Sequence, residues 1–165
     1  MKFKSEHRFG GITLAQYEEL YFNEEFNIAL CQQVGLHRTL VSRDDANGKI
    51  RRVVRVAPER ELPGPVAKLL GAPRLEYTET VEYSWGSGRG VWSTQMAVMS
   101  DKVDSRGTFT FATSGDGVNR TIDGDVTVRV PLIGGTIEKA VVAEVSTGYD
   151  RAADFTRQWL IKHPR

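Results

Sequence analysis

The sequence predicts an α+β fold in which a curved, seven-stranded antiparallel sheet wraps around one long C-terminal helix, with two short helices after the first strand. Three observations predict it. Apolar and polar side chains alternate in several segments between residues 36 and 130, as in strands with one wet face. Turn signals separate these segments at hairpin distances. The last segment, residues 137–160, repeats its apolar residues with helical spacing instead. A chain of 165 residues is expected to form a single domain, 1–165.

The N-terminal part is expected to form one strand and two short helices. Residues 2–9 alternate loosely and stop at a glycine pair, which indicates a strand. Thr13 and Gln16 have the spacing of a capping box, so a helix should begin at Leu14. Asn23 can cap a second helix. Apolar residues recur there every four positions, at Phe26, Leu30 and Val34.

Residues 36–44 and 49–57 are expected to form two strands of a tight hairpin. Both segments alternate, and Asn47-Gly48 between them is a strong signal for a two-residue turn. The following proline-rich segment, residues 58–73, holds four of the six prolines. Proline cannot donate to a strand ladder, so this segment is expected to be a structured lip rather than a strand.

Four more strands are expected to complete the sheet. The fourth begins at Arg74, and the segments 86–90, 100–105 and 114–117 turn the chain into the fifth, sixth and seventh. The dry face of the fourth strand carries Leu75, Tyr77, Val81, Tyr83 and Trp85. The dry face of the seventh carries Ile122, Val126, Val128 and Val130.

The final helix is expected to run for about 25 residues after a cap at Thr136, which makes it about 37 Å long. A helix of this length should lie along the whole dry face of the sheet. One stripe carries Ile137, Val141, Val145, Gly148, Ala152, Phe155 and Trp159. A glycine inside a helix costs about 1 kcal/mol relative to alanine. For Gly148 two explanations stay open: a structural one, in which it allows close contact with an aromatic side chain of the sheet or a slight bend, and a role beside a ligand.

Charge and cysteine content argue against several functions. The formal charge is +1, from 22 basic and 21 acidic residues, so nothing favours a nucleic-acid partner. Cys31 is the only cysteine, and the histidines His7, His37 and His163 lack metal-ligand spacing. We therefore expect no metal and no cofactor. No apolar run suits a signal peptide or a membrane span, which predicts a cytoplasmic protein.

The C-terminal third resembles a known family. The segment 130–139, VPLIGGTIEK, and the ending Phe155-Thr156-x-x-Trp159-Leu160 look like the C-terminal signature of the uncharacterised bacterial DUF2505 family. The expected element order is similar to the helix-grip arrangement of the START-like (SRPBCC, Bet v 1-like) superfamily. That resemblance implies a hydrophobic molecule held between sheet and helix. Some superfamily members are cyclases or hydratases, and others are chaperone cofactors. No ligand-specific motif of a subgroup is present, so no binding residue is transferred.

Glu79 is the least expected residue of the predicted sheet. Alternation places it on the dry face between Tyr77 and Val81, where an unpaired carboxylate is costly. Arg52 takes the matching position on the neighbouring third strand, so an Arg52–Glu79 pair is the natural hypothesis. The pair could serve only to fix the strand register, a bulge could turn one side chain outward, or the two residues could anchor the polar group of a ligand.

Other candidates for a ligand cavity come from the strands and from the final helix. Gln95 is a polar candidate, because both sides of its strand carry apolar residues. The mouth candidates belong to the proline-rich segment, where the alternative is a loop packed on the core: Val66, Leu69 and Leu70. The wall candidates, for which core packing is the alternative, are Tyr77, Tyr83, Trp92, Phe109, Phe111, Val145, Gly148 and Ala152.

The leading functional hypothesis is a protein that binds, and as a carrier transports, a lipid or another hydrophobic small molecule. Transient membrane contact through Leu69 and Leu70 is compatible with that role. The alternatives are an enzyme of the polyketide cyclase or hydratase type, with Glu79 as general base, and an interaction module without an occupied cavity. No catalytic residue and no oligomeric state are predicted.

Overall fold

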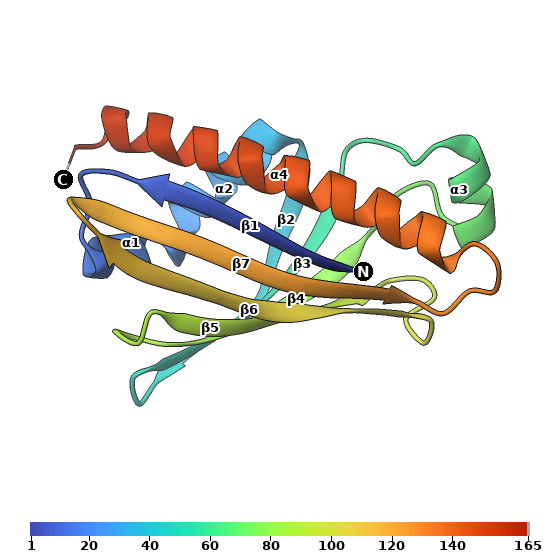
Figure 1. The fold of residues 1–165 in the computed structure, drawn as a ribbon, viewed down its shortest axis with the longest axis horizontal. Helices are drawn as coiled ribbons and strands as arrows, with labels where there is room; N and C mark the ends of the chain where they lie inside the picture. Colours follow the sequence, from blue (N-terminus) through green and yellow to red (C-terminus); the bar gives the residue numbers. More distant parts are fainter. Residues whose placement is uncertain (165) are drawn as a thin grey trace.

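The computed structural model describes residues 1–164 and confirms the predicted α+β architecture (Figure 1). Its predicted elements follow in the expected order, and the proline-rich segment adds one short helix, α3, that was not predicted. The elements are β1 Lys2–Phe9, α1 Leu14–Tyr21, α2 Glu24–Val34, β2 Leu36–Ala46, β3 Lys49–Pro58, α3 Gly64–Leu70, β4 Tyr77–Ser84, β5 Arg89–Met96, β6 Val103–Ser114, β7 Gly117–Val128 and α4 Gly134–Lys162.

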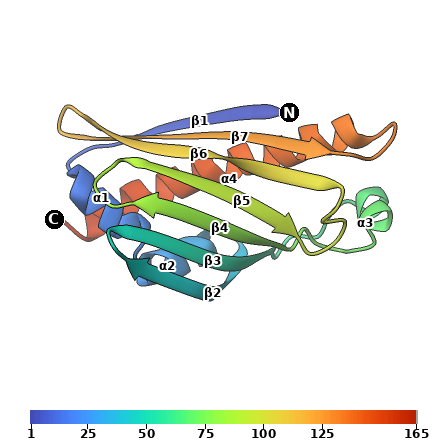
Figure 2. The ribbon, with the colours of Figure 1, turned by 90° about the horizontal axis from the view of Figure 1, so that it is seen from below.

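The seven strands form one antiparallel sheet in the order β1-β7-β6-β5-β4-β3-β2. The first strand therefore lies beside the last one, with Lys2 opposite Asp125 and Phe9 opposite Val118. Helix α4 runs along one face of this sheet (Figure 1). The view from below shows the strands in front of α4, with α1 and α2 toward one end of the molecule and α3 at the other (Figure 2).

Local sequence signals position the two N-terminal helices as expected. The Thr13 side chain accepts the backbone N–H of Gln16, and the Gln16 side chain accepts the N–H of Thr13, so the capping box is complete. The Asn23 side chain accepts the N–H of Phe26 at 2.8 Å and starts α2. Gly35 ends α2 in the left-handed conformation, which glycine adopts without strain.

Three predicted boundaries were wrong. Helix α4 begins at Gly134 after Ile133 and has no side-chain cap, so Thr136 lies inside its first turn. A Cβ at Gly134 would lie 2.3 Å from the Val128 carbonyl oxygen, which shows that the helix starts directly against the end of β7. Strand β4 begins at Tyr77 rather than Arg74, and β6 already begins at Val103, inside the predicted turn.

The core is built on the concave face of the sheet, where large aromatic rings lie over glycines. Trp92 lies across Gly107 and Gly124: a Cβ at Gly107 would be 2.8 Å from the Trp92 Nε1, and a Cβ at Gly124 would be 2.6 Å from its ring. The Phe3 ring also contacts Gly124. These two glycines let the Trp92 indole lie flat against the strands.

Candidate functional site

Helix α4 leaves a space above the middle of the sheet. It packs on β1 and β7 at one side and on α2 at the other, and within residues 1–164 no Cα of α4 comes within 8 Å of a Cα in β2–β6. The space is a partly enclosed cavity of about 390 Å³ between the concave face, α2 and α4. This volume lies within the range of small-molecule sites.

The wall of the cavity is mainly apolar. All seven strands of the sheet contribute residues, α2 contributes one side, α4 covers the top, and α3 contributes Leu70 at the end of the molecule. The principal apolar residues are Phe26, Leu30, Cys31, Val54, Val56, Leu70, Leu75, Trp92, Met96, Val98, Ile137, Val141 and Val145. Burial raises the pKa of the Cys31 thiol, so this thiol stays protonated.

Polar groups are set into this apolar wall. Four tyrosines contribute ring hydroxyls, and burial raises the pKa of each: to about 12 for Tyr21, and upward for Tyr17, Tyr77 and Tyr149. These hydroxyls therefore remain protonated hydrogen-bond donors at neutral pH. The charged side chains in the wall include Arg38, Arg52, Glu79 and Arg120.

Glu79 faces the cavity from β4. It lies opposite Val54 of β3 and Thr94 of β5, and it is one of the residues that line the cavity. Burial raises the pKa of the Glu79 carboxyl, and the positive charges of Arg52 and Arg38 offset part of that rise. The protonated form is thus stabilised relative to a carboxyl in water.

Arg52 shares the concave face with Glu79 but does not form the predicted ion pair with it in residues 1–164. Its register partner is Val81, and its guanidinium donates to the backbone carbonyl of Tyr21 at 3.2 Å. It also lies 5.6 Å from the centre of the Tyr21 ring and 5.1 Å from that of Phe22. The helix pair α1–α2 draws Arg52 away from Glu79, so the two residues interact only through their charges.

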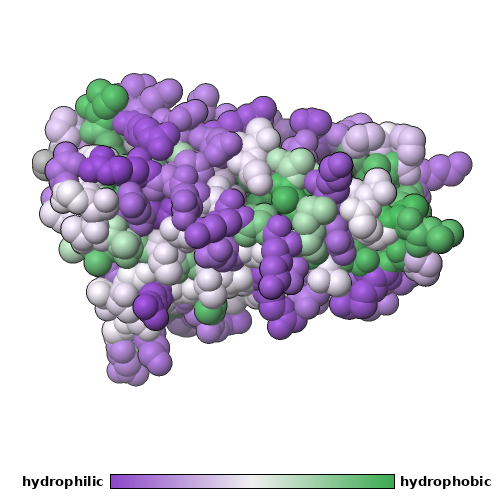
Figure 3. All heavy atoms as spheres, viewed as in Figure 1, coloured by the Kyte–Doolittle hydropathy of each residue, from purple (hydrophilic) through white to green (hydrophobic). Residues whose placement is uncertain are grey.

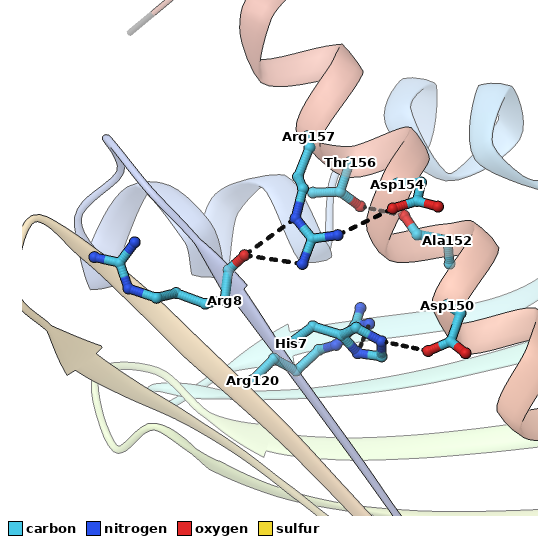
Figure 4. Close-up of polar contacts among 8 residues, drawn as sticks. All are labelled: His7, Arg8, Arg120, Asp150, Ala152, Asp154, Thr156 and Arg157. Carbon is cyan, nitrogen blue, oxygen red and sulfur yellow. Dashed lines mark hydrogen bonds and ion pairs between the residues drawn. The ribbon is translucent and has the colours of Figure 1, made fainter.

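Arg120 enters the cavity from β7 and was not predicted. It is 5% exposed and lies directly opposite His7 of β1 in the strand register. Its Nη2 bonds to the His7 Nδ1 at 3.1 Å, and the His7 Nε2 bonds to Asp150 of α4 at 2.8 Å (Figure 4). Arginine has only donors, so His7 Nδ1 accepts and Nε2 carries the proton that Asp150 accepts. This chain of contacts joins β7, β1 and α4.

Several predicted site residues do meet at the cavity. Besides Arg52 and Glu79, the cavity is lined by Leu70, Tyr77, Trp92, Val145, Gly148 and Ala152.

The other predicted residues lie elsewhere. Tyr83, Phe109 and Phe111 are packed into the aromatic core under α1, with Tyr83 and Phe109 stacked at 5.7 Å and Phe109 stacked on Tyr21 at 5.4 Å. Gln95 is exposed on the outer face of β5. These four residues therefore do not line the cavity.

The predicted mouth is divided between cavity and surface. Leu70 is buried and contributes to the wall, whereas Leu69 is 45% exposed and Val66 is half-buried outside the lining. The short helix α3 places neighbouring leucines on opposite sides.

Gly148 lies in the middle of α4 beside open space. A Cβ built on it would meet no atom within 4 Å, so no aromatic ring from the sheet requires the glycine. Of the two explanations offered by the sequence, close packing against an aromatic side chain is therefore wrong. Gly148 lines the cavity instead, and its missing side chain leaves room there.

The sequence contained a signal for Arg120 that the prediction did not use. The same alternation that turns Ile122 and Val126 inward also turns Arg120 inward. Arg38 was missed for another reason. It pairs with Glu24 of α2, and a bulge between Leu40 and Ser42 breaks the alternation of β2.

Other features of the described chain are less suited to binding. A wider and more open depression of about 760 Å³ adjoins the β2–β3 hairpin, and its rim carries the exposed, paired charges of Arg51 and Glu82. Residues 1–164 contain no group of three or more His, Cys, Asp or Glu side chains placed to bind a metal ion. No helix within them is both long and apolar enough to cross a membrane.

Comparison with solved structures shows the same fold in several bacterial proteins. A protein from Thermus thermophilus aligns with a TM-score of 0.69 at 14% identity, covering 100% of both chains. An aromatase/cyclase from a Streptomyces species aligns with a TM-score of 0.65 at 10% identity, over 100% of this chain and 97% of the other. A START superfamily protein from Mycobacterium smegmatis aligns with a TM-score of 0.58 at 13% identity, over 98% and 97%. These likenesses confirm the START-like fold.

Sequence comparison identifies the family. No curated protein gives a significant match. The family described as "Protein of unknown function (DUF2505)" matches residues 6–160, which include part or all of every strand and nearly all of α4. The chain belongs to the DUF2505 family.

Proposed function

We propose that this protein binds a small hydrophobic molecule, a lipid or an aromatic compound, in the cavity between the sheet and α4. The observation that carries the proposal is the space of about 390 Å³ that α4 leaves above β3–β5, walled mainly by apolar side chains and containing a few polar groups. The likeness to a START superfamily protein and to an aromatase/cyclase supports this proposal.

The finer form of the proposal is a carrier that exchanges its ligand at a membrane. The exposed Leu69 of α3 and the fully exposed Leu132 of the β7–α4 connection support it. Figure 3 shows hydrophobic residues gathered at the end of the molecule where this connection lies. Leu70, next to Leu69, reaches the cavity wall, so α3 would link such a surface to the ligand. Transfer between vesicles that slows in a Leu69→Ser, Leu132→Ser double variant would test it.

Native mass spectrometry of the freshly purified protein, followed by organic extraction, tests the binding function. We expect a stoichiometric hydrophobic molecule to leave the protein on extraction. Gly148→Leu should reduce its occupancy, because the side chain would enter the open space beside Gly148. Gly135→Leu is a matched control, since Gly135 is exposed in the same helix and also faces open space. A bare protein that also ignores a lipid panel would favour an interaction module.

A second candidate function is that of a cyclase-type enzyme. The observation that favours it is the Glu79 carboxyl, whose pKa is raised by burial beside the protonated hydroxyls of Tyr77 and Tyr149. A carboxyl of this kind can move a proton at neutral pH if a substrate comes within hydrogen-bond reach. Glu79→Gln separates the two functions. An enzyme should lose turnover, whereas a carrier should still bind and change only its ligand preference.

A further inference from the structure

The positive charge of Arg120 is held inside the molecule without a carboxylate in direct contact, because Asp150 reaches it only through His7. Its guanidinium lies 5.3 Å from the centre of the Phe9 ring and 5.9 Å from that of Tyr149, and its bonded partner His7 is held as an acceptor. Within residues 1–164 neither Arg120 nor Arg52 forms an ion pair with a carboxylate, although both are 5% exposed. A buried cation without a counter-ion is costly.

The carboxylates near the cavity do not balance these two arginines. Glu24 pairs with Arg38, and the exposed Glu144 pairs with Arg60 at 3.3 Å. Glu79 is the remaining carboxyl in the described cavity wall, and its burial favours the neutral form. The interior of the cavity therefore carries an excess of positive charge.

Hydrogen-bond donors are in excess there as well. Four buried donor atoms of cavity residues have no acceptor within residues 1–164: Arg38 Nη2, Arg52 Nε, Trp92 Nε1 and Arg120 Nε. The hydroxyl of Tyr149, beside Arg120, stays protonated because burial raises its pKa. Buried donors are normally satisfied, so this surplus calls for a ligand with acceptor atoms.

We propose that the hydrophobic molecule bound in the cavity is an acid, whose anionic oxygen atoms bind to the guanidinium of Arg120 while Arg52 stabilises the charge from across the cavity. This inference rests on the proposed binding function and narrows its ligand class. Guanidinium binds carboxylate or phosphate through paired hydrogen bonds. The link from Arg120 through His7 to Asp150 makes His7 a positioning residue that keeps the guanidinium in place.

The test compares four single-chain probes that share an apolar body: dodecanoic acid, dodecyl phosphate, dodecanol and dodecylamine. Their affinities for the delipidated wild-type protein are measured by isothermal titration calorimetry below the micelle concentrations. We expect at least one of the two acids to bind about tenfold or more tightly than dodecanol, with the amine weakest, and the better acid identifies the anionic group. A tenfold ratio corresponds to about 1.4 kcal/mol.

Arg120→Gln should bring the affinity for the acid down to that for dodecanol and leave dodecanol unchanged. Arg129→Gln is the control, because Arg129 is exposed and donates to the Asp101 carbonyl instead. His7→Phe should weaken acid binding less than Arg120→Gln does, and again without affecting the alcohol. If Arg120→Gln does not fold, the wild-type probe series decides alone.

Two results would overturn the inference and spare the binding function. One is equal affinity for dodecanol and the acids, and the other is a preference for dodecylamine, which would assign the head group to Glu79. Loss of acid preference in Arg52→Gln but not in Arg120→Gln would overturn the assignment to Arg120. If none of the four probes binds, the inference fails together with the proposed function.

Discussion

Replacing Gly148 by alanine should stabilise the protein. Gly148 lies inside the 29-residue helix α4, and a Cβ there would meet no atom within 4 Å. The substitution therefore removes the unfavourable helix propensity of glycine without adding a steric clash. We expect a gain of about 1 kcal/mol, which raises Tm by about 2–4 °C for a chain of this size.

Urea unfolding followed by circular dichroism measures this gain. Gly135→Ala is the matched control, because its Cβ also meets open space but lies in the first turn of α4, where the gain should be smaller. Gly124→Ala is the opposite control. Its Cβ would lie 2.4 Å from the Phe3 ring, so it should cost about 1–3 kcal/mol.

A loss of stability in Gly148→Ala would refute this reasoning. It would mean that α4 bends or packs closely at Gly148 in solution, which was the other explanation offered by the sequence. A gain accompanied by weaker ligand binding would instead show that the glycine is kept for the space it leaves in the cavity.

Three further predictions concern buried titratable groups. Burial raises the pKa of Glu79, so its contribution to the free energy of unfolding falls as pH rises through the carboxyl range. Glu79→Gln should therefore be more stable than wild type at pH 7. Urea unfolding at a series of pH values should show the difference in free energy of unfolding shrinking below about pH 4. Burial raises the pKa of the Cys31 thiol, so it should react with iodoacetamide at least about tenfold more slowly in the folded protein than in the protein unfolded by urea. Bound ligand should slow the reaction further. Equal rates, measured by mass spectrometry, would contradict the place of Cys31 in the cavity wall. Glu18→Ala removes the acceptor of the Tyr83 hydroxyl and of the Gly86 N–H, so it should lower the free energy of unfolding by about 2–3 kcal/mol, measured by thermal unfolding. The exposed Glu25→Ala is the control and should cost less than about 0.5 kcal/mol.

Most of the fold could be predicted because its signals are local. The capping box at Thr13, the Asn47-Gly48 hairpin and the alternation around Ile122 each depend on a few neighbouring residues. The start of α4 could not be predicted in this way. It depends on the contact of Gly134 with the Val128 carbonyl, and no cap marks it in the sequence.

The site was harder to predict, because inward-facing residues divide between core and cavity by their depth. Tyr77 and Tyr83 alternate to the same face of β4, yet only Tyr77 reaches the cavity, since α1 covers Tyr83. The positions of α1 and α4 over the concave face decide that division, and they are a property of the whole fold. The predicted Arg52–Glu79 ion pair is absent from the described residues for a similar reason, because the backbone carbonyl of Tyr21 binds the Arg52 guanidinium instead.

The pairing of β1 with β7 also sets the order in which the chain can fold. Residues 2–9 must wait for partners at 118–125, which leave the ribosome more than a hundred residues later. Until α4 follows, the part of the apolar concave face beneath that helix stays exposed. Such long-range pairing folds slowly and exposes aggregation-prone surface meanwhile. Chaperone demand should therefore be greatest until α4 has been synthesised, and a chain cut before residue 134 should aggregate rather than fold.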